Sequence, residues 1–327
     1  MTAIGRLATA FLACIAIAAG LVVSPAHSDA ARVAVGAYVP GGAARERSIE
    51  RFARQVGRDP LVVVSYKDWD RPPFDPAELW TVWERGAVPL VTWEPWSWDH
   101  PRRRFPLRRI AAGAFDGYVR AAARQAAAWR WPIMLRFAHE MNARWYPWGR
   151  GVRGNTAAHY RSAWRHLVAV FRQEGARNVR WVWTPYVNRG RMPFTQLYPG
   201  DRWVDWVGLD GFNWGGPTFF SFAELFGASY RTLVDITPRP VMIAETGSVE
   251  QGGSKPEWIT RALTRALPRF GHVRAVLWWN EVHPSGADWR IDTSDAALAA
   301  LRNGLASSNF ELSREAFLAI PRRLSGP

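Results

Sequence analysis

Eight short apolar segments alternate with amphipathic helical patterns along the chain, and this alternation predicts an α/β fold built on a parallel sheet. The chain has 327 residues, 48% of them hydrophobic, which is enough for one large core. No G-x-G-x-x-G motif follows the first segment, and eight repeats suit a closed barrel better than an open sheet. We therefore predict a single-domain (β/α)8 barrel of the TIM-barrel type.

The predicted strands are β-branched or apolar runs at 33–39, 61–66, 88–94, 133–138, 179–184, 206–212, 241–245 and 273–280. The predicted helices lie between them at 46–56, 76–85, 111–128, 156–173, 222–235 and 256–270. Asn155 is a good N-cap, and Gly86, Gly175 and Gly271 stand where helices should end. The link at 193–200 has the weakest helical pattern and is expected to be mostly loop.

The N-terminal segment has the pattern of a signal peptide. Arg6 is followed by an apolar run at 7–23 and then by small and polar residues, with cleavage expected near Ser28 or Ala30. The alternative is a retained membrane anchor, but the run has about the minimum length that spans a bilayer. The single cysteine, Cys14, lies in this segment, so the mature protein should lack disulfides. We expect a signal peptide at 1–28 and a secreted or periplasmic protein.

The rest of the chain is expected to form a catalytic domain at 29–308 and a C-terminal extension at 309–327 on the surface. The formal net charge is +14, with arginines spread along the whole sequence and a small cluster at 102–104 and 108–109. No nucleic-acid motif accompanies them, so a nucleic-acid partner is not expected. Diffuse positive charge leaves a mildly anionic polysaccharide or a cell surface open as partners. The 20 tryptophans suit stacking on sugar rings as well as core packing.

Two predicted strands end in a glutamate. The fourth runs through Arg136 into His139-Glu140, and the seventh reads Val-Met-Ile-Ala-Glu245-Thr-Gly. In a (β/α)8 barrel the carboxyl ends of the strands form the face where ligands bind. Glycoside hydrolysis needs a pair of carboxyl groups that flank the scissile bond. Glu140 and Glu245 are therefore the candidate catalytic pair.

A metal site and a structural ion pair are the two alternatives to a catalytic pair. A zinc site of the H-E-x-x-H type fails because the fifth position is Ala143 and the segment is a strand end. For either glutamate alone, a structural ion pair with an arginine is the other alternative. We expect no metal ion and no cofactor.

The chain resembles glycoside hydrolase family 26 from the fourth strand onward. The resemblance rests on the run from Arg136 through Trp148 and on Trp-Val-Trp-Thr-Pro at 181–185. It continues in Gly-Leu-Asp-Gly-Phe-Asn-Trp at 208–214 and Ala-Glu-Thr-Gly-Ser at 244–248. The family contains mainly β-mannanases, with some mixed-linkage β-glucanases and β-1,3-xylanases, on a barrel. The resemblance implies a retaining reaction with Glu140 as acid/base and Glu245 as nucleophile.

The same resemblance implies roles for further residues of the strand ends. Arg136 would lower the pKa of the nucleophile through its fixed charge, and His139 would donate to the sugar 2-hydroxyl group or hold the nucleophile's carboxylate in place. Trp145 and Trp278 are expected to contact sugar rings, with Trp279 as the alternative to Trp278. The remaining substrate-binding candidates are Trp93, Glu94, Trp96, Asn142, Phe212 and Trp214.

Two of these candidates raise particular points. Glu94 is expected to accept hydrogen bonds from substrate hydroxyls, and a structural pairing with the arginines at 102–104 is the alternative. Phe212 departs from the family, which commonly places a tyrosine there in contact with the nucleophile. A hydroxyl group would then be missing at the nucleophile.

Together these features predict a secreted, monomeric, retaining endo-β-glycan hydrolase that acts on a β-linked polysaccharide. The first expected substrate is β-1,4-mannan, and a mixed-linkage β-1,3-1,4-glucan or a β-1,3-xylan is the alternative. A non-catalytic polysaccharide-binding barrel for exopolysaccharide handling is the alternative of another class. No membrane association is expected after signal cleavage.

Overall fold

The computed structural model describes residues 32–100, 102–188, 193–217 and 219–324. The predicted signal peptide and Cys14 lie outside the described residues. Within the described ranges, no helix is both long enough and apolar enough to cross a bilayer.

Eight parallel strands form a closed barrel in chain order, with β1 paired to both β2 and β8. The strands are β1 Ala34–Tyr38, β2 Val62–Asp68, β3 Val88–Glu94, β4 Ile133–Phe137, β5 Val179–Trp183, β6 Trp206–Asn213, β7 Val241–Ser248 and β8 Val273–Trp279. All eight predicted strands and the barrel are confirmed. The strands were recognisable because each is buried on both faces and therefore reads as an apolar run.

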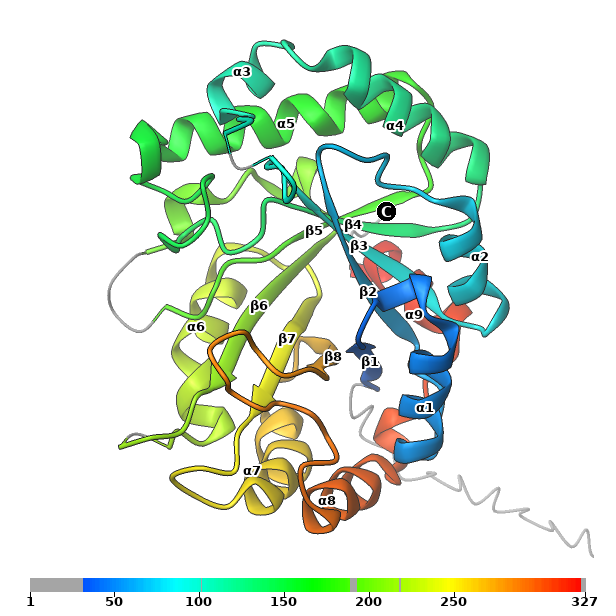
Figure 1. Ribbon diagram of the computed structural model, residues 1–327, viewed down its shortest axis with the longest axis vertical. Coiled ribbons are helices and arrows are strands. Elements are labelled where there is room, and N and C mark those ends of the chain that lie inside the picture. The colour runs from blue at the N-terminus through cyan, green and yellow to red at the C-terminus, as the bar shows by residue number, and fades with distance from the viewer. Residues whose placement is uncertain (1–31, 101, 189–192, 218, 325–327) are drawn as a thin grey trace, which may run out of the picture.

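Helices surround the barrel (Figure 1). They are α1 Glu46–Val56, α2 Pro76–Glu84, α3 Leu107–Ala111, α4 Asp116–Trp129, α5 Ala157–Gln173, α6 Phe222–Ile236, α7 Lys255–Arg261, α8 Asp295–Leu305 and α9 Arg314–Leu324. The helix predicted at 111–128 begins later, at Asp116, because Gly113 has a φ of 77° and separates α4 from α3, which ends at Ala111. The helix predicted at 256–270 changes after Arg261 into a π turn and then a 3₁₀ turn. Pro268 lacks the N–H that a continuing α-helix needs there.

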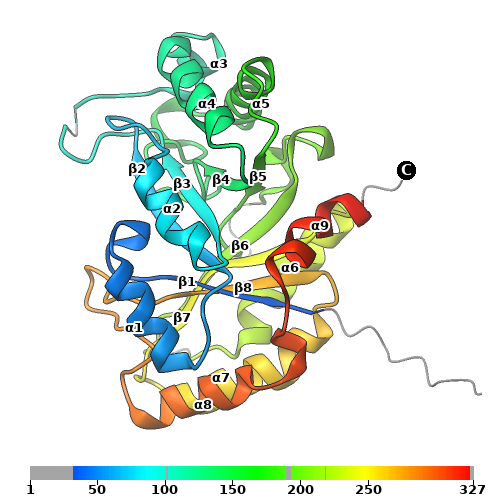
Figure 2. The ribbon, with the colours of Figure 1, turned by 90° about the vertical axis from the view of Figure 1, so that its right-hand side faces the viewer.

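Most described residues of the C-terminal segment are exposed or half-buried, but one side chain of α9 reaches the core. Phe317 of α9 is fully buried. Its ring lies 4.9 Å from that of Trp206, the first residue of β6, and both belong to the cluster that fills the barrel interior. Figure 2 shows α9 at the end of the barrel where β1 begins. The segment therefore covers the end opposite to the carboxyl ends of the strands.

Candidate active site

A cleft of about 770 Å³ opens at the carboxyl ends of the strands. Three glutamates line it, Glu94 of β3, Glu140 after β4 and Glu245 of β7, together with a ring of aromatic side chains. Each glutamate is at most 5% exposed. No arginine or lysine of the described residues lines this space, which we call the glutamate cleft.

Glu245 is held by two donors. The guanidinium of Arg136 donates from Nη2 to Oε1 at 2.5 Å, and the hydroxyl of Tyr66 donates to the same oxygen at 2.5 Å. The pairing of β7 with β8 shifts register between Ile243 and Thr246, so Glu245 lies in a bulge. Bulges commonly turn a side chain toward a site. Glu245 is thus fixed in place as a carboxylate that faces the cleft.

Arg136 crosses the barrel interior from β4 and is completely buried. Its Nη1 lies 3.1 Å from Oδ1 of Asp210 on β6, and its Nε and Nη2 donate to Oγ1 of Thr92 on β3. A buried guanidinium is stable only when it is paired and its donors are satisfied. The charge of Arg136 is therefore compensated by partners from three other strands, and one of these partners is Glu245, the carboxyl group on which the family resemblance implied that it acts.

Glu140 follows β4 in an unusual backbone conformation. Its φ is 52°, and that of Ala138 is 45°, in the left-handed region that non-glycine residues rarely adopt. The backbone N–H of Glu140 donates to the carbonyl of Thr184 at 2.8 Å, which holds the turn. Such conformations persist where the surroundings enforce them, often at active sites. Here the turn directs the carboxyl group into the cleft.

The two central glutamates differ in their electrostatic surroundings. Burial, together with the negative charge of Glu245, raises the pKa of Glu140 to about 8, although the Trp145 N–H donates to its Oε2 at 2.6 Å. Glu140 therefore carries a proton at neutral pH, whereas the guanidinium of Arg136 pairs with Glu245 as a carboxylate. A pair of carboxyl groups in opposite states is what acid-assisted displacement requires.

Glu94 is the third acidic group of the cleft. Its Oε2 accepts from the indole N–H groups of Trp96 and Trp98, each at 2.9 Å. Burial raises its pKa to about 7. The alternative pairing with the arginines at 102–104 is not found among the contacts, since Arg103 pairs with Asp70 instead. Glu94 is positioned to accept hydrogen bonds from a ligand in the cleft.

Comparisons with known proteins agree with this geometry. The family model described as glycosyl hydrolase family 26 matches residues 114–251, which include both Glu140 and Glu245. The chain is 36% identical over 292 residues to Endoglucanase H of Acetivibrio thermocellus, a match that covers 84% of this chain and 31% of that protein.

The chain belongs to glycosyl hydrolase family 26.

Two further relatives of this family 26 chain carry mannanase names. It is 29% identical over 159 residues to Mannan endo-1,4-beta-mannosidase A and B of Caldalkalibacillus mannanilyticus, covering 46% of this chain and 28% of that protein. A Cellulomonas fimi endo-beta-1,4-mannanase double mutant superimposes with a TM-score of 0.67 at 19% identity, covering 87% of this chain and 72% of that one. The likeness to that structure concerns the fold. The chain spans less than one third of the length of the two sequence relatives.

His139 lies beneath the cleft of this family 26 barrel and does not line it. It is 1% exposed, and its ring lies 4.9 Å from that of Tyr146. Burial, helped by the charge of Arg136, lowers its pKa well below the usual value, so the imidazole is neutral. Ring and carboxylate atoms of His139, Asp210 and Glu245 lie within 4.8 Å of one another, so the imidazole is close to the carboxylate of Glu245.

Those three residues form the one group among the described residues with the ligand types and spacing of a metal site. Arg136 already pairs with both Asp210 and Glu245 in the same space. A cation there would meet the guanidinium charge and compete for both carboxylates. The group therefore suits an arginine better than a metal ion.

Three predicted substrate contacts are wrong. Trp93 is fully buried on the outer face of β3, where its Nε1 donates to the hydroxyl of Tyr118, because neighbouring strand residues point to opposite faces. Asn142 bridges two loops through both backbone groups of Tyr186, each at 2.8 Å. Trp278 also turns outward, toward the helices.

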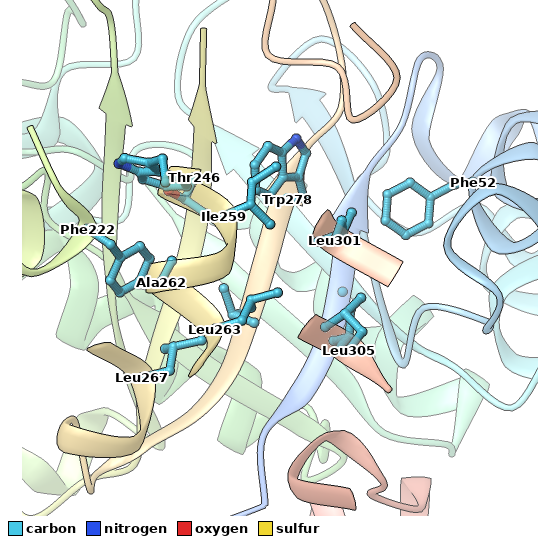
Figure 3. A pocket seen from close by; sticks show the side chains of 14 residues that line it. Phe52, Phe222, Thr246, Ile259, Ala262, Leu263, Leu267, Trp278, Leu301 and Leu305 are labelled. Atoms are coloured by element: carbon cyan, nitrogen blue, oxygen red, sulfur yellow. The ribbon is translucent and has the colours of Figure 1, made fainter. Parts of the chain in front are cut away.

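Trp278 lines a small void of about 20 Å³ among apolar side chains of α7 and α8, as Figure 3 shows. Its Nε1 donates to the carbonyl of Trp289 at 2.6 Å. Trp279 is the ring that lines the glutamate cleft. It stacks on Tyr38 with centroids 5.0 Å apart and donates to the hydroxyl of Tyr66 at 3.2 Å. Trp279, which was the alternative to Trp278 as a sugar contact, is therefore the one of the two that lies in the cleft.

The other aromatic candidates lie at the clefts as expected. Trp145 and Trp214 line the glutamate cleft and are 58% and 44% exposed. Phe212 lines it too and stacks on Trp289 with centroids 4.0 Å apart. Trp96 lines a neighbouring cleft, described below, and reaches Glu94 through its N–H.

The hydroxyl group that Phe212 lacks is supplied by another strand. Tyr66 of β2 donates to Glu245, and burial raises its pKa, so it stays protonated as a donor. Tyr66 was not among the site residues predicted from the sequence. It is nevertheless a polar residue at the end of the predicted strand 61–66, which is where a (β/α)8 barrel places its active-site residues. Trp289, in the loop after β8, had no comparable signal.

Proposed function

We propose that this chain is a retaining endo-acting β-glycan hydrolase whose acid/base is Glu140 and whose nucleophile is Glu245. The observation that supports it most directly is the contrast between two buried carboxyl groups in one cleft: Glu245 pairs with Arg136, whereas Glu140 has no ion pair among the described residues and burial raises its pKa. Residues 1–28 support, by their sequence alone, a secreted or periplasmic place of action.

In the first step, Glu140 gives its proton to the glycosidic oxygen while Oε of Glu245 attacks the anomeric carbon. The carbon–oxygen bond to the leaving sugar breaks, and a glycosyl ester forms on Glu245. In the second step, Glu140, now a carboxylate, takes a proton from water, and the hydroxide oxygen displaces Glu245. Two inversions at the anomeric carbon give net retention.

For the substrate, a β-glucan backbone is the first candidate and β-mannan the second. The match to Endoglucanase H covers 84% of this chain, whereas the match to Mannan endo-1,4-beta-mannosidase A and B covers 46%. This order reverses the one expected from the sequence. Trp279 would lie under the sugar in either case, since stacking on a ring face does not depend on one hydroxyl group.

The test is a reducing-sugar assay of the purified protein on lichenan, laminarin, mannan, glucomannan and xylan. Glu140→Ala and Glu245→Ala are compared with Glu84→Ala, an exposed glutamate of α2 that has no ion pair with any of the described residues. We expect both cleft variants to lose at least about 10²- to 10⁴-fold in rate. Equal activity of all three variants on every polymer would overturn the proposal.

Azide rescue separates the two roles. With an aryl β-glycoside substrate, azide should restore Glu245→Ala and give a glycosyl azide of inverted configuration. Azide should restore Glu140→Ala with retained configuration. Exchange of these two outcomes would reverse the assignment of acid/base and nucleophile.

A further inference from the structure

A second cleft, of about 660 Å³, adjoins the glutamate cleft and shares Trp98, Trp145 and Tyr146 with it. Its other wall is made by the segment before α3 and the loop between β4 and α5. Five arginines line it, and none of its described lining residues is acidic. They are Arg103, Arg104, Arg108, Arg144 and Arg153, and we call this space the arginine cleft.

Positive charge is more concentrated in this cleft than in the chain as a whole. The whole chain has 42 basic and 28 acidic side chains, whereas the cleft has five and none. Only Arg103 has an ion-pair partner among the described residues, Asp70 at 2.5 Å. The other four side chains are exposed and have no carboxylate within ion-pair distance in that part of the chain. Their charge is available to a ligand.

The shared wall between the clefts is aromatic. Trp145 is 58% exposed and Trp98 is 40% exposed, unusual for tryptophan unless the ring face is used. Trp145 also donates to Glu140, so a sugar stacked on it lies close to the reacting bond. A glycan bound in the glutamate cleft can therefore continue over this wall toward the arginines.

We propose that the arginine cleft binds acidic sugar units, that is, units carrying a carboxylate, of the same glycan whose backbone lies in the glutamate cleft. Guanidinium groups match carboxylates with two parallel hydrogen bonds. A uniform polyanion such as a nucleic acid fits less well, because its next charges would enter the glutamate cleft, where Glu245 would repel them and no described lining residue is an arginine or a lysine. The favoured ligand is a mainly neutral β-glycan with scattered carboxylates. This inference rests on the proposed function.

The experiment compares two forms of one polymer, lichenan and lichenan with a small fraction of its C6 hydroxyl groups oxidised to carboxylates. The readout is the ratio of kcat/KM on the oxidised polymer to kcat/KM on the neutral one. The test variant is Arg104→Gln/Arg144→Gln/Arg153→Gln. The matched control is Arg47→Gln/Arg51→Gln/Arg265→Gln, which changes three exposed arginines on other surfaces that form no ion pair with any of the described residues.

We expect the ratio to fall roughly three- to thirtyfold in the test variant and to stay unchanged in the control. We also expect the wild-type ratio to fall toward that of the test variant in 0.5 M salt, because exposed charges are screened. Equal ratios for both triple variants would overturn the inference, since removal of charge anywhere would then have the same effect.

Binding provides a readout that does not need turnover. Calorimetry with Glu140→Gln and oligosaccharides from the oxidised polymer should show tighter binding than with the neutral oligosaccharides. Adding the three cleft substitutions should remove the difference. If no polymer is hydrolysed but this difference is seen, the proposed function fails and the acidic-sugar subsite stands. If hydrolysis depends on both glutamates but the difference is absent, the subsite fails alone.

Discussion

The two clefts share three aromatic side chains and differ in how they hold charge. In the glutamate cleft every glutamate is at least 95% buried, and its carboxyl group accepts a hydrogen bond from a tryptophan or pairs with Arg136. In the arginine cleft the side chains of Arg104, Arg144 and Arg153 are exposed and have no ion-pair partner among the described residues. Burying a charge costs desolvation free energy, so the folded protein must supply partners that compensate for it. An exposed charge stays hydrated and is screened by salt.

Because of this difference, we expect the glutamate cleft to carry out proton transfer and the arginine cleft to contribute to substrate recognition. A buried carboxyl group has a shifted pKa, and Glu140 can therefore hold a proton at neutral pH. An exposed arginine keeps its ordinary charge and contributes to recognition. Substitutions in the glutamate cleft should change rates and stability strongly, and those in the arginine cleft should change preference between substrates.

The largest expected effect is that of Arg136→Gln. It would leave Asp210 and Glu245 buried without their shared cation, so we expect a loss of about 3–5 kcal/mol in the free energy of unfolding. Activity should be lost as well. Urea unfolding followed by circular dichroism measures the first effect, with Arg104→Gln as the control that keeps the wild-type midpoint. A wild-type midpoint for Arg136→Gln would show that the interior carboxylates do not need this charge.

An intermediate effect is expected for Tyr66→Phe. The variant keeps the ring and removes the hydroxyl group that donates to Glu245. A hydrogen bond to a charged group contributes roughly 1.5–3 kcal/mol, so kcat/KM should fall about 10- to 100-fold. Tyr118→Phe removes a hydroxyl group that bonds to Trp93, away from the carboxyl groups, and should leave kcat/KM unchanged. Equal rates for Tyr66→Phe and wild type would mean that Arg136 alone holds the nucleophile.

The barrel and the presence of Glu140 and Glu245 at one cleft could be predicted from sequence because both leave local signals. Each strand is an apolar run, and Glu140 and Glu245 interrupt two of those runs at their ends. The choice between Trp278 and Trp279 could not be made reliably. The pairing of β7 with β8 shifts register, and one residue of shift exchanges the two faces of a strand.

Contacts between distant segments left no local signal. Phe317 packs on Trp206, which lies 111 residues earlier in the sequence, and no pattern in the C-terminal segment indicates that it contributes to the barrel core. The arginine cleft is similar. The cluster at 102–104 and 108–109 was visible, but Arg144 and Arg153 join it only because the loop after β4 folds beside the segment before α3.

The smallest expected effect, and the most specific one, is a shift of the pH profile in Trp145→Phe. In the proposed reaction Glu140 acts as an acid, so kcat/KM should fall above its pKa of about 8 in the wild type. The Trp145 N–H stabilises the carboxylate form and so lowers that pKa; its removal raises the pKa. A hydrogen bond of roughly 0.5–1.5 kcal/mol corresponds to a shift of about 0.4–1 pH unit, toward alkaline pH.

Trp98→Phe is the matched control for this shift, because Trp98 belongs to the same shared wall but donates to Glu94. Its removal raises the pKa of Glu94 and so leaves less negative charge near Glu140. The alkaline limb should then stay in place or move slightly toward acidic pH. An alkaline shift in both variants would trace the effect to the loss of an aromatic ring from the wall. An alkaline shift in Trp145→Phe alone would trace it to the hydrogen bond on Glu140, and would show that the wall between the two clefts also sets the strength of the catalytic acid.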